Sequence, residues 1–220
     1  MNSREVRFLQ MEVRAEEDKI SHNAVITGYP IVFNQVTDLG GIREVIEPES
    51  VEDRTVLRDV ALMVGHDFGM IPLAHSRRNN ENSTMQLEPD EHGVRMRAVL
   101  DVEHNPKAAE VYSAIKRGDI SGMSFAFIVN KEAWEDVDSD APLRRIQGFS
   151  RIFECSIVAF PAYPGTSVQA ASEGDALESV RAALESERER RQQERDEAAE
   201  QERRRAALAR LEKLQEEARA

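Results

Sequence analysis

The chain has 220 residues and a formal net charge of -12, with 29 Lys and Arg against 41 Asp and Glu. Binding to phosphates needs a clustered basic surface. None precedes the C-terminal segment, so we expect no nucleic-acid partner. No stretch approaches the roughly 20 apolar residues that span a bilayer, and charges interrupt the N-terminal segment, so we expect no membrane partner and no signal peptide. The single cysteine, Cys155, excludes an intrachain disulfide and is typical of an intracellular protein.

Composition changes sharply near Ala170. Every proline, aromatic residue and histidine lies before this point, and Ala, Glu, Arg and Gln dominate after it. We therefore expect a globular domain over residues 1–170 and a charged helical tail over residues 171–220.

The first half of the globular part has the pattern of a mostly β domain, in which short apolar runs alternate with turn formers. Residues Val25 to Phe33 and Ala61 to Val64 read as strands. Thr84 to Leu87 and Val94 to Leu100 flank a turn-rich segment, which predicts a hairpin.

The second half begins with a predicted helix over Pro106 to Arg117, which Gly118 ends. Met123 to Val129 and Arg151 to Phe160 are the two strongest strand predictions. Between them, Lys131 to Gln147 is acidic and lacks a period, so we interpret it as a surface loop. The fold class is therefore α+β and mainly β.

The tail reads as a long polar helix. Its apolar residues gather near the two ends: Leu177, Val180 and Leu184 at one, and Leu208, Leu211 and Leu214 at the other. This pattern allows coiled-coil pairing, although the heptads are not sustained. The tail is either a solvated extension or a helix that binds a partner during assembly.

Three polar residues lie in apolar segments far apart in the sequence. Ser124 shares a strand face with Gly122 and Ala126, whose small side chains leave its hydroxyl accessible. Such a serine is most often only a tolerated polar residue. A nucleophilic role demands a base within hydrogen-bond reach and a group that orients the base.

Histidine is the obvious base. We prefer His66, which follows the apolar run that ends at Val64, over His75, which precedes a polar segment. A structural histidine at the end of a strand is the plain alternative. Glu154 is the third candidate, because both faces of its strand are largely apolar and a carboxylate there is uncommon unless paired. Its alternative is an edge strand with Glu154 facing water.

The sequence does not predict a metal or cofactor site. The histidines lack metal-ligand spacing, Cys155 has no companion, and no glycine-rich loop could cradle phosphates. We therefore expect no metal and no cofactor.

At these residues the sequence resembles the prohead proteases of tailed bacteriophages. The similar elements follow the family's order over about residues 20–170: Gly28, Tyr29 and Phe33; Glu44, Ile46 and Pro48; Val64, Gly65, His66 and Asp67; Asp90 and Gly93; Gly118, Met123, Ser124 and Phe125; and Glu154, Ser156, Ile157, Val158, Pro161 and Ala162. Each element is weak alone, but their common order makes the match specific.

The resemblance implies a β-barrel core with flanking helices, similar to the herpesvirus assemblin proteases. It also implies Ser124 as nucleophile, His66 as general base and Glu154 as third member of a triad. The sequence departs from the family pattern at Ala126, where a glycine is common, and at Glu49 and Ser50, which replace a Gly-Ala pair.

No oxyanion donor can be assigned from the sequence. Backbone amides near Ser124, or the side chains of Arg144 and Arg145, are the candidates.

The implied function is a serine endopeptidase that cleaves capsid or scaffold protein inside the immature head, in the host cytoplasm. Its partners would be the major capsid protein or its scaffolding segment, and self-association as a dimer or larger assembly is left open. The rival hypothesis is a non-enzymatic scaffold or capsid-assembly protein whose tail does the binding. A hydrolase of small esters is disfavoured, because the chain has no Gly-x-Ser-x-Gly elbow.

Overall fold

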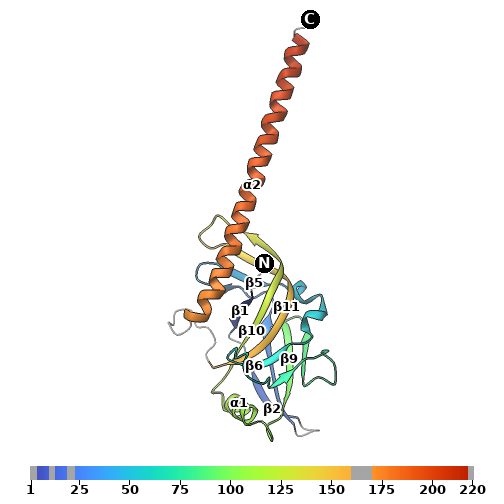
Figure 1. The fold of residues 1–220 in the computed structure, drawn as a ribbon, viewed down its shortest axis with the longest axis vertical. Coiled ribbons are helices and arrows are strands. Elements are labelled where there is room, and N and C mark those ends of the chain that lie inside the picture. The colour runs from blue at the N-terminus through green and yellow to red at the C-terminus, as the bar shows by residue number, and fades with distance from the viewer. Residues whose placement is uncertain (1–3, 10–12, 19–22, 160–169, 218–220) are drawn as a thin grey trace.

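The structure is a computed structural model that describes residues 4–9, 13–18, 23–159 and 170–217. Its described strands form two sheets, with a short helix at one end and a long helix that extends away from them (Figure 1). The larger sheet contains β1 (Glu5–Leu9), β10 (Gly122–Glu135), β11 (Leu143–Val158), β5 (Arg43–Ile46), β4 (Thr37–Asp38), β6 (Ala61–Val64) and β7 (Ala74–His75). The smaller sheet contains β2 (Arg14–Glu17), β3 (Ala24–Val32), β9 (Gly93–Leu100) and β8 (Met85–Pro89).

The main core joins the two sheets. Ile26 and Met96 of the smaller sheet and Phe125, Phe127 and Ile152 of the larger one belong to a single buried cluster. No hydrogen-bonded strand pair links the sheets within the described residues, so they do not close into one barrel. The α+β, mainly β class is confirmed, and the barrel is not.

The long antiparallel hairpin of β10 and β11 corrects one prediction. We expected a surface loop over Lys131 to Gln147, but most of this segment continues the two strands, and only residues 136–142 connect them. Trp134, Leu143 and Ile146 are buried, while intervening charged side chains hide the two-residue period. The strand prediction at Phe160 lies outside the described residues.

The helix α1 (Pro106–Arg117) has the predicted bounds. The Asn105 side chain accepts hydrogen bonds from the backbone N–H groups of Lys107 and Ala108, which caps the first turn. Gly118 ends the helix with a φ of 80°, a left-handed conformation that favours glycine. Two short 3-10 helices, η1 (Pro48–Val51) and η2 (Arg54–Leu57), precede β6.

The tail forms the helix α2 (Ala170–Glu217), as expected. Near its beginning, Val180 and Leu184 are buried against Trp134 and Val137 at the tip of the hairpin. Residues 192–210 are exposed, and this part of α2 extends away from the sheets (Figure 1). No described helix is both long enough and apolar enough to cross a membrane.

Candidate active site

A tight turn after β6 sets the position of His66. Gly65 and His66 both have a φ of 60°, and for histidine this conformation is strained by about 1–3 kcal/mol. The Gly65 N–H donates to the Ile157 carbonyl, and the His66 N–H donates to the Ser156 hydroxyl at 3.0 Å. The turn therefore directs the imidazole back over β11.

Neighbouring strands place Ser124 and Glu154 beneath that ring. In the β10–β11 register, Ser124 pairs with Ser156 and Ala126 pairs with Glu154. On its other side, β11 pairs with β6, so Glu154 lies on an interior strand. The alternative of an edge strand with Glu154 facing water is therefore wrong.

The structure brings together all three residues that the sequence singled out. His66 Nε2 lies 2.7 Å from Ser124 Oγ, and His66 Nδ1 lies 2.7 Å from Glu154 Oε1. The side chain of His66 is 14% exposed, whereas Ser124 and Glu154 are fully buried. A carboxylate beside Nδ1 favours the tautomer with its proton there, which leaves the Nε2 lone pair facing the serine.

Ser156 supports this arrangement from below. Its hydroxyl donates to Glu154 Oε2 at 2.6 Å and accepts from the His66 N–H, so both carboxylate oxygens have partners. A buried carboxylate that accepts two hydrogen bonds is held in one orientation. From the sequence, Ser156 was identified only as part of the family resemblance, and no role was predicted for it.

The strand β1 covers the serine, and sequence reasoning missed it. Phe8 is the register partner of Ser124, and the Ser124 hydroxyl oxygen lies 2.7 Å from the Arg7 carbonyl oxygen, so its single hydrogen serves either that carbonyl or His66 Nε2. The alternation of Glu5, Val6, Arg7 and Phe8 was a strand signal. In this arrangement, solvent does not reach the hydroxyl.

Beside this strand lies a charge cluster of two arginines and three glutamates: Arg7, Arg144, Glu5, Glu44 and Glu132. All five N–H groups of Arg144 donate to these carboxylates. Arg144 is almost fully buried in β11, so the prediction that it lies in a loop is wrong. Because all its N–H groups donate to carboxylates, none is available to bind an oxyanion. Arg145 also belongs to β11 and pairs with Glu47 and Glu135.

The ion pairs of Glu44 and Arg7 favour the ionised forms of both side chains. Burial alone would raise the pKa of Glu44, but Arg7 and Arg144 outweigh burial and hold that pKa below its usual value. Burial likewise opposes the charge on Arg7, yet Glu44 and Glu5 raise its pKa above the usual value. The cluster therefore holds β1 through buried ion pairs.

Other reactive groups are less suited to nucleophilic chemistry. Burial raises the pKa of the Cys155 thiol well above its usual range, so the thiolate is disfavoured. His75, the alternative base, lies 3.6 Å from Asp59, and burial lowers its pKa. Within the described residues, no group of histidine, cysteine and acidic side chains has an arrangement that could hold a metal ion.

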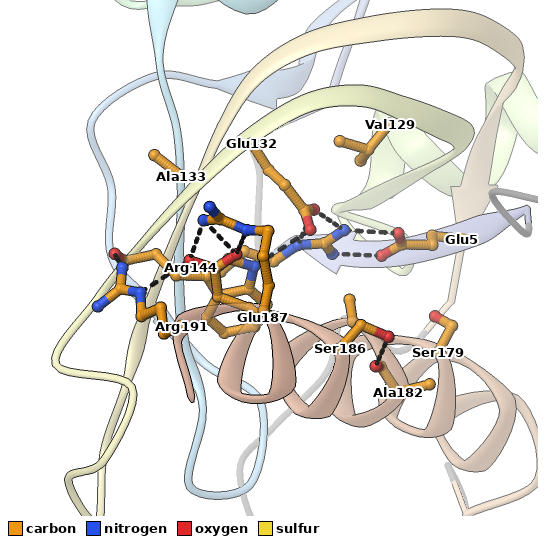
Figure 2. A pocket seen from close by; sticks show the side chains of 13 residues that line it. Glu5, Val129, Glu132, Ala133, Arg144, Ser179, Ala182, Ser186, Glu187 and Arg191 are labelled. Carbon is orange, nitrogen blue, oxygen red and sulfur yellow. Dashed lines mark hydrogen bonds and ion pairs between the residues drawn. The ribbon is translucent and has the colours of Figure 1, made fainter. Parts of the chain in front are cut away.

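A cleft lies elsewhere, between α2 and the hairpin. It has a volume of about 630 Å³, and none of the three candidate residues lines it. Figure 2 shows Arg144 between Glu5 and Glu132, with α2 passing beside them. The other charged side chains that line the cleft are mostly paired, as in the contacts of Glu187 with Arg190 and Arg191.

Comparison with known proteins also indicates that the chain is a peptidase. A family model matches residues 9–179, which is more than half of the chain, and it defines a class of viral proteases. The model is that of the caudovirus prohead serine proteases, and this chain belongs to that family.

Two known proteins are similar to this chain. The chain is 26% identical over 176 residues to the prohead protease of Enterobacteria phage HK97, a match that covers 79% of this chain and 71% of the relative. The capsid assembly protease of bacteriophage T4 is similar at 15% identity and a TM-score of 0.40, over 71% of this chain and 99% of the other.

Proposed function

We propose that this chain is a serine endopeptidase that cleaves capsid or scaffold protein during prohead maturation, by a Ser-His-Glu acyl-enzyme mechanism. The observation that carries the proposal is the continuous hydrogen-bonded line from Ser124 through His66 to Glu154, with 2.7 Å at each step. The shared family supports the protease activity and its place in head assembly.

In this mechanism His66 accepts the Ser124 proton as the serine oxygen attacks a substrate carbonyl carbon. The Glu154 carboxylate holds the ring and stabilises the imidazolium that forms. His66 then gives the proton to the leaving amine, and water releases the acyl group. Because the Arg7 carbonyl contacts the serine hydroxyl, β1 has to leave before a substrate can approach.

The proposed place of action is the interior of the assembling prohead in the host cytoplasm, with the major capsid protein or its scaffolding segment as partner. Self-association of the enzyme, pairing of its tail as a coiled coil and kinship with the herpesvirus assemblins stay predictions. The rival is a non-enzymatic scaffold or assembly protein, in which the same residues only pack.

A serine-directed phosphonate and co-expression with the capsid precursor test the proposal together. We expect the phosphonate to label Ser124 and the precursor to be cut, and we expect Ser124→Ala to abolish both while its circular dichroism stays unchanged. Cysteine-directed alkylation serves as the control, because buried Cys155 should not react in the native chain. Cleavage that persists in Ser124→Ala would place the nucleophile elsewhere, and an unlabelled, inactive wild type would favour the rival.

A further inference from the structure

The strand β1 follows the path that an extended peptide would take across the candidate active site. It is an edge strand of the larger sheet, and it runs antiparallel to β10, the strand that carries Ser124. A peptide that adds to a sheet edge makes the same backbone contacts as a strand. The residue whose carbonyl carbon lies beside the nucleophile is the one after which a protease cuts. In β1 the carbonyl group that contacts Ser124 is that of Arg7, whose oxygen lies 2.7 Å from Ser124 Oγ.

The side chain of Arg7 occupies a prepared pocket. It is 4% exposed, and its Nε and terminal nitrogen donate to the two oxygens of Glu44 at 2.5 and 2.8 Å. Its guanidinium carbon lies 5.3 Å from the centre of the Phe127 ring. This two-pronged contact matches a planar guanidinium better than a lysine ammonium.

The charges that stay behind when β1 leaves show what the pocket requires. Glu5 and Arg7 belong to β1, whereas Glu44, Glu132 and Arg144 belong to β5, β10 and β11. Without β1, the carboxylates of Glu44 and Glu132 face only the Arg144 guanidinium. Glu44 also loses the two hydrogen bonds that it accepted from Arg7. A buried carboxylate without its partner is costly, so the incoming peptide should supply a cation at this point.

Building on the proposed function, we propose that Glu44 determines substrate specificity, and that the enzyme cuts after a basic residue, Arg in preference to Lys, that occupies the pocket of Arg7. Ser124 Oγ bonds to the carbonyl carbon of that residue, and the tetrahedral intermediate collapses as the peptide C–N bond breaks. The leaving amine takes the proton that His66 received from the serine. Water then hydrolyses the ester and restores the serine.

Four synthetic peptides with the sequence of residues 3–12 test this inference on the full chain. They carry Arg, Lys, Leu or Glu at the position of Arg7 and are otherwise identical. We expect cleavage directly after that position, with kcat/KM for the Arg peptide about 30-fold or more above that for the Leu or Glu peptide. Equal rates, or a preference for Leu or Glu, would overturn the inference and leave the proposed function intact.

Phosphonate labelling in the same samples separates the two proposals. A chain that labels at Ser124 but cuts none of the four peptides contradicts the specificity alone. A chain that neither labels nor cuts contradicts the proposed function, and the specificity falls with it.

Substitution of Glu44 provides a second test of the specificity. Glu44→Gln should lower kcat/KM for the Arg peptide at least about tenfold and change the Leu peptide much less. The matched control is Glu135→Gln, an exposed glutamate of the same sheet that pairs with Arg145, and it should leave all four values unchanged. Glu44→Asp keeps the charge but shortens the reach, so the margin of Arg over Lys should shrink. An equal loss for every peptide would mean that Glu44 only holds the fold.

Discussion

At the scale of single residues, Ser156 links two members of the candidate triad. It accepts from the His66 backbone N–H at 3.0 Å and donates to the Glu154 carboxylate at 2.6 Å. It does not contact Ser124 in any described hydrogen bond, so we regard it as a positioning residue. Groups that orient the reacting side chains in this way are often worth one or two orders of magnitude in rate.

We therefore expect Ser156→Ala to lower kcat about 10-fold or more and to leave KM nearly unchanged, because the substrate contacts stay in place. Ser156→Thr keeps the hydroxyl and should recover most of the rate. Steady-state kinetics on one peptide substrate measure both variants. If Thr recovers nothing, or if KM changes as much as kcat, the role of Ser156 is packing and not positioning.

At the scale of elements, buried charge holds β1 on the sheet. The Arg7 and Arg144 guanidinium groups hold the pKa of Glu44 below its usual value of 4.5. A carboxylate whose folded-state pKa is lowered adds stability above the unfolded value, and this contribution is lost as pH falls through the folded value. The ion pairs of Glu44 should thus stabilise the chain fully above about pH 4.5 and progressively less below it.

Urea unfolding followed by the fluorescence of Trp134, the single tryptophan, measures this contribution. Glu44→Gln should lower the free energy of unfolding at pH 7 by about 3 kcal/mol, since it leaves buried guanidinium groups short of a partner. Its stability should also fall less than that of the wild type as the pH drops below about 4.5. Glu135→Gln, on the surface, should follow the wild-type curve. If the free energies of unfolding of Glu44→Gln and wild type changed with pH in parallel, Glu44 would not be a source of the pH dependence.

The beginning of α2 is a second element held by burial. Leu184 is 6% exposed in the cluster around Trp134 and Val137, while Leu208 on the same helix is 61% exposed. Leu184→Ala should therefore lower the free energy of unfolding by about 2–4 kcal/mol. The matched change Leu208→Ala should stay within about 0.5 kcal/mol of the wild type. Similar losses in both variants, measured by urea unfolding, would contradict the docking of α2.

At the scale of the whole molecule, α2 has two different parts along its length. Arg188 and Arg191 donate to backbone carbonyls of the hairpin, and Arg195 pairs with Asp138. Beyond these contacts the helix extends away from the sheets (Figure 1), and its described side chains are exposed as far as residue 210. We propose that this outer part recruits the enzyme into the assembling shell.

Deletion of residues 196–220 should remove recruitment without disturbing the core, because the deletion begins after the last docking contact. We expect an unchanged free energy of unfolding and unchanged phosphonate labelling, but loss of the protein from assembled proheads. Quantitative mass spectrometry of purified proheads measures the incorporated copies, with the full-length chain as reference. Normal incorporation of the shortened chain would show that recruitment uses another surface.

Much of the local structure was predictable from the sequence, since it follows from periodicity and caps. The bounds of α1 follow from the asparagine cap and Gly118, and the strand around Ser124 follows from its apolar run. The candidate triad was also within reach, because Ser124, Glu154 and His66 interrupt or end apolar segments. A polar group in such a place requires a partner wherever the fold buries it.

Only the tertiary structure decided what surrounds those residues. Arg144 looks solvated in the sequence because its partner Glu5 is 139 residues away, and Glu44 lies 37 residues from Arg7. Likewise, no local pattern tells which strand lies beside β10, or that two open sheets form instead of a barrel. Periodicity records which face of a segment is buried, whereas the identity of the covering surface depends on contacts between segments that are distant in the chain.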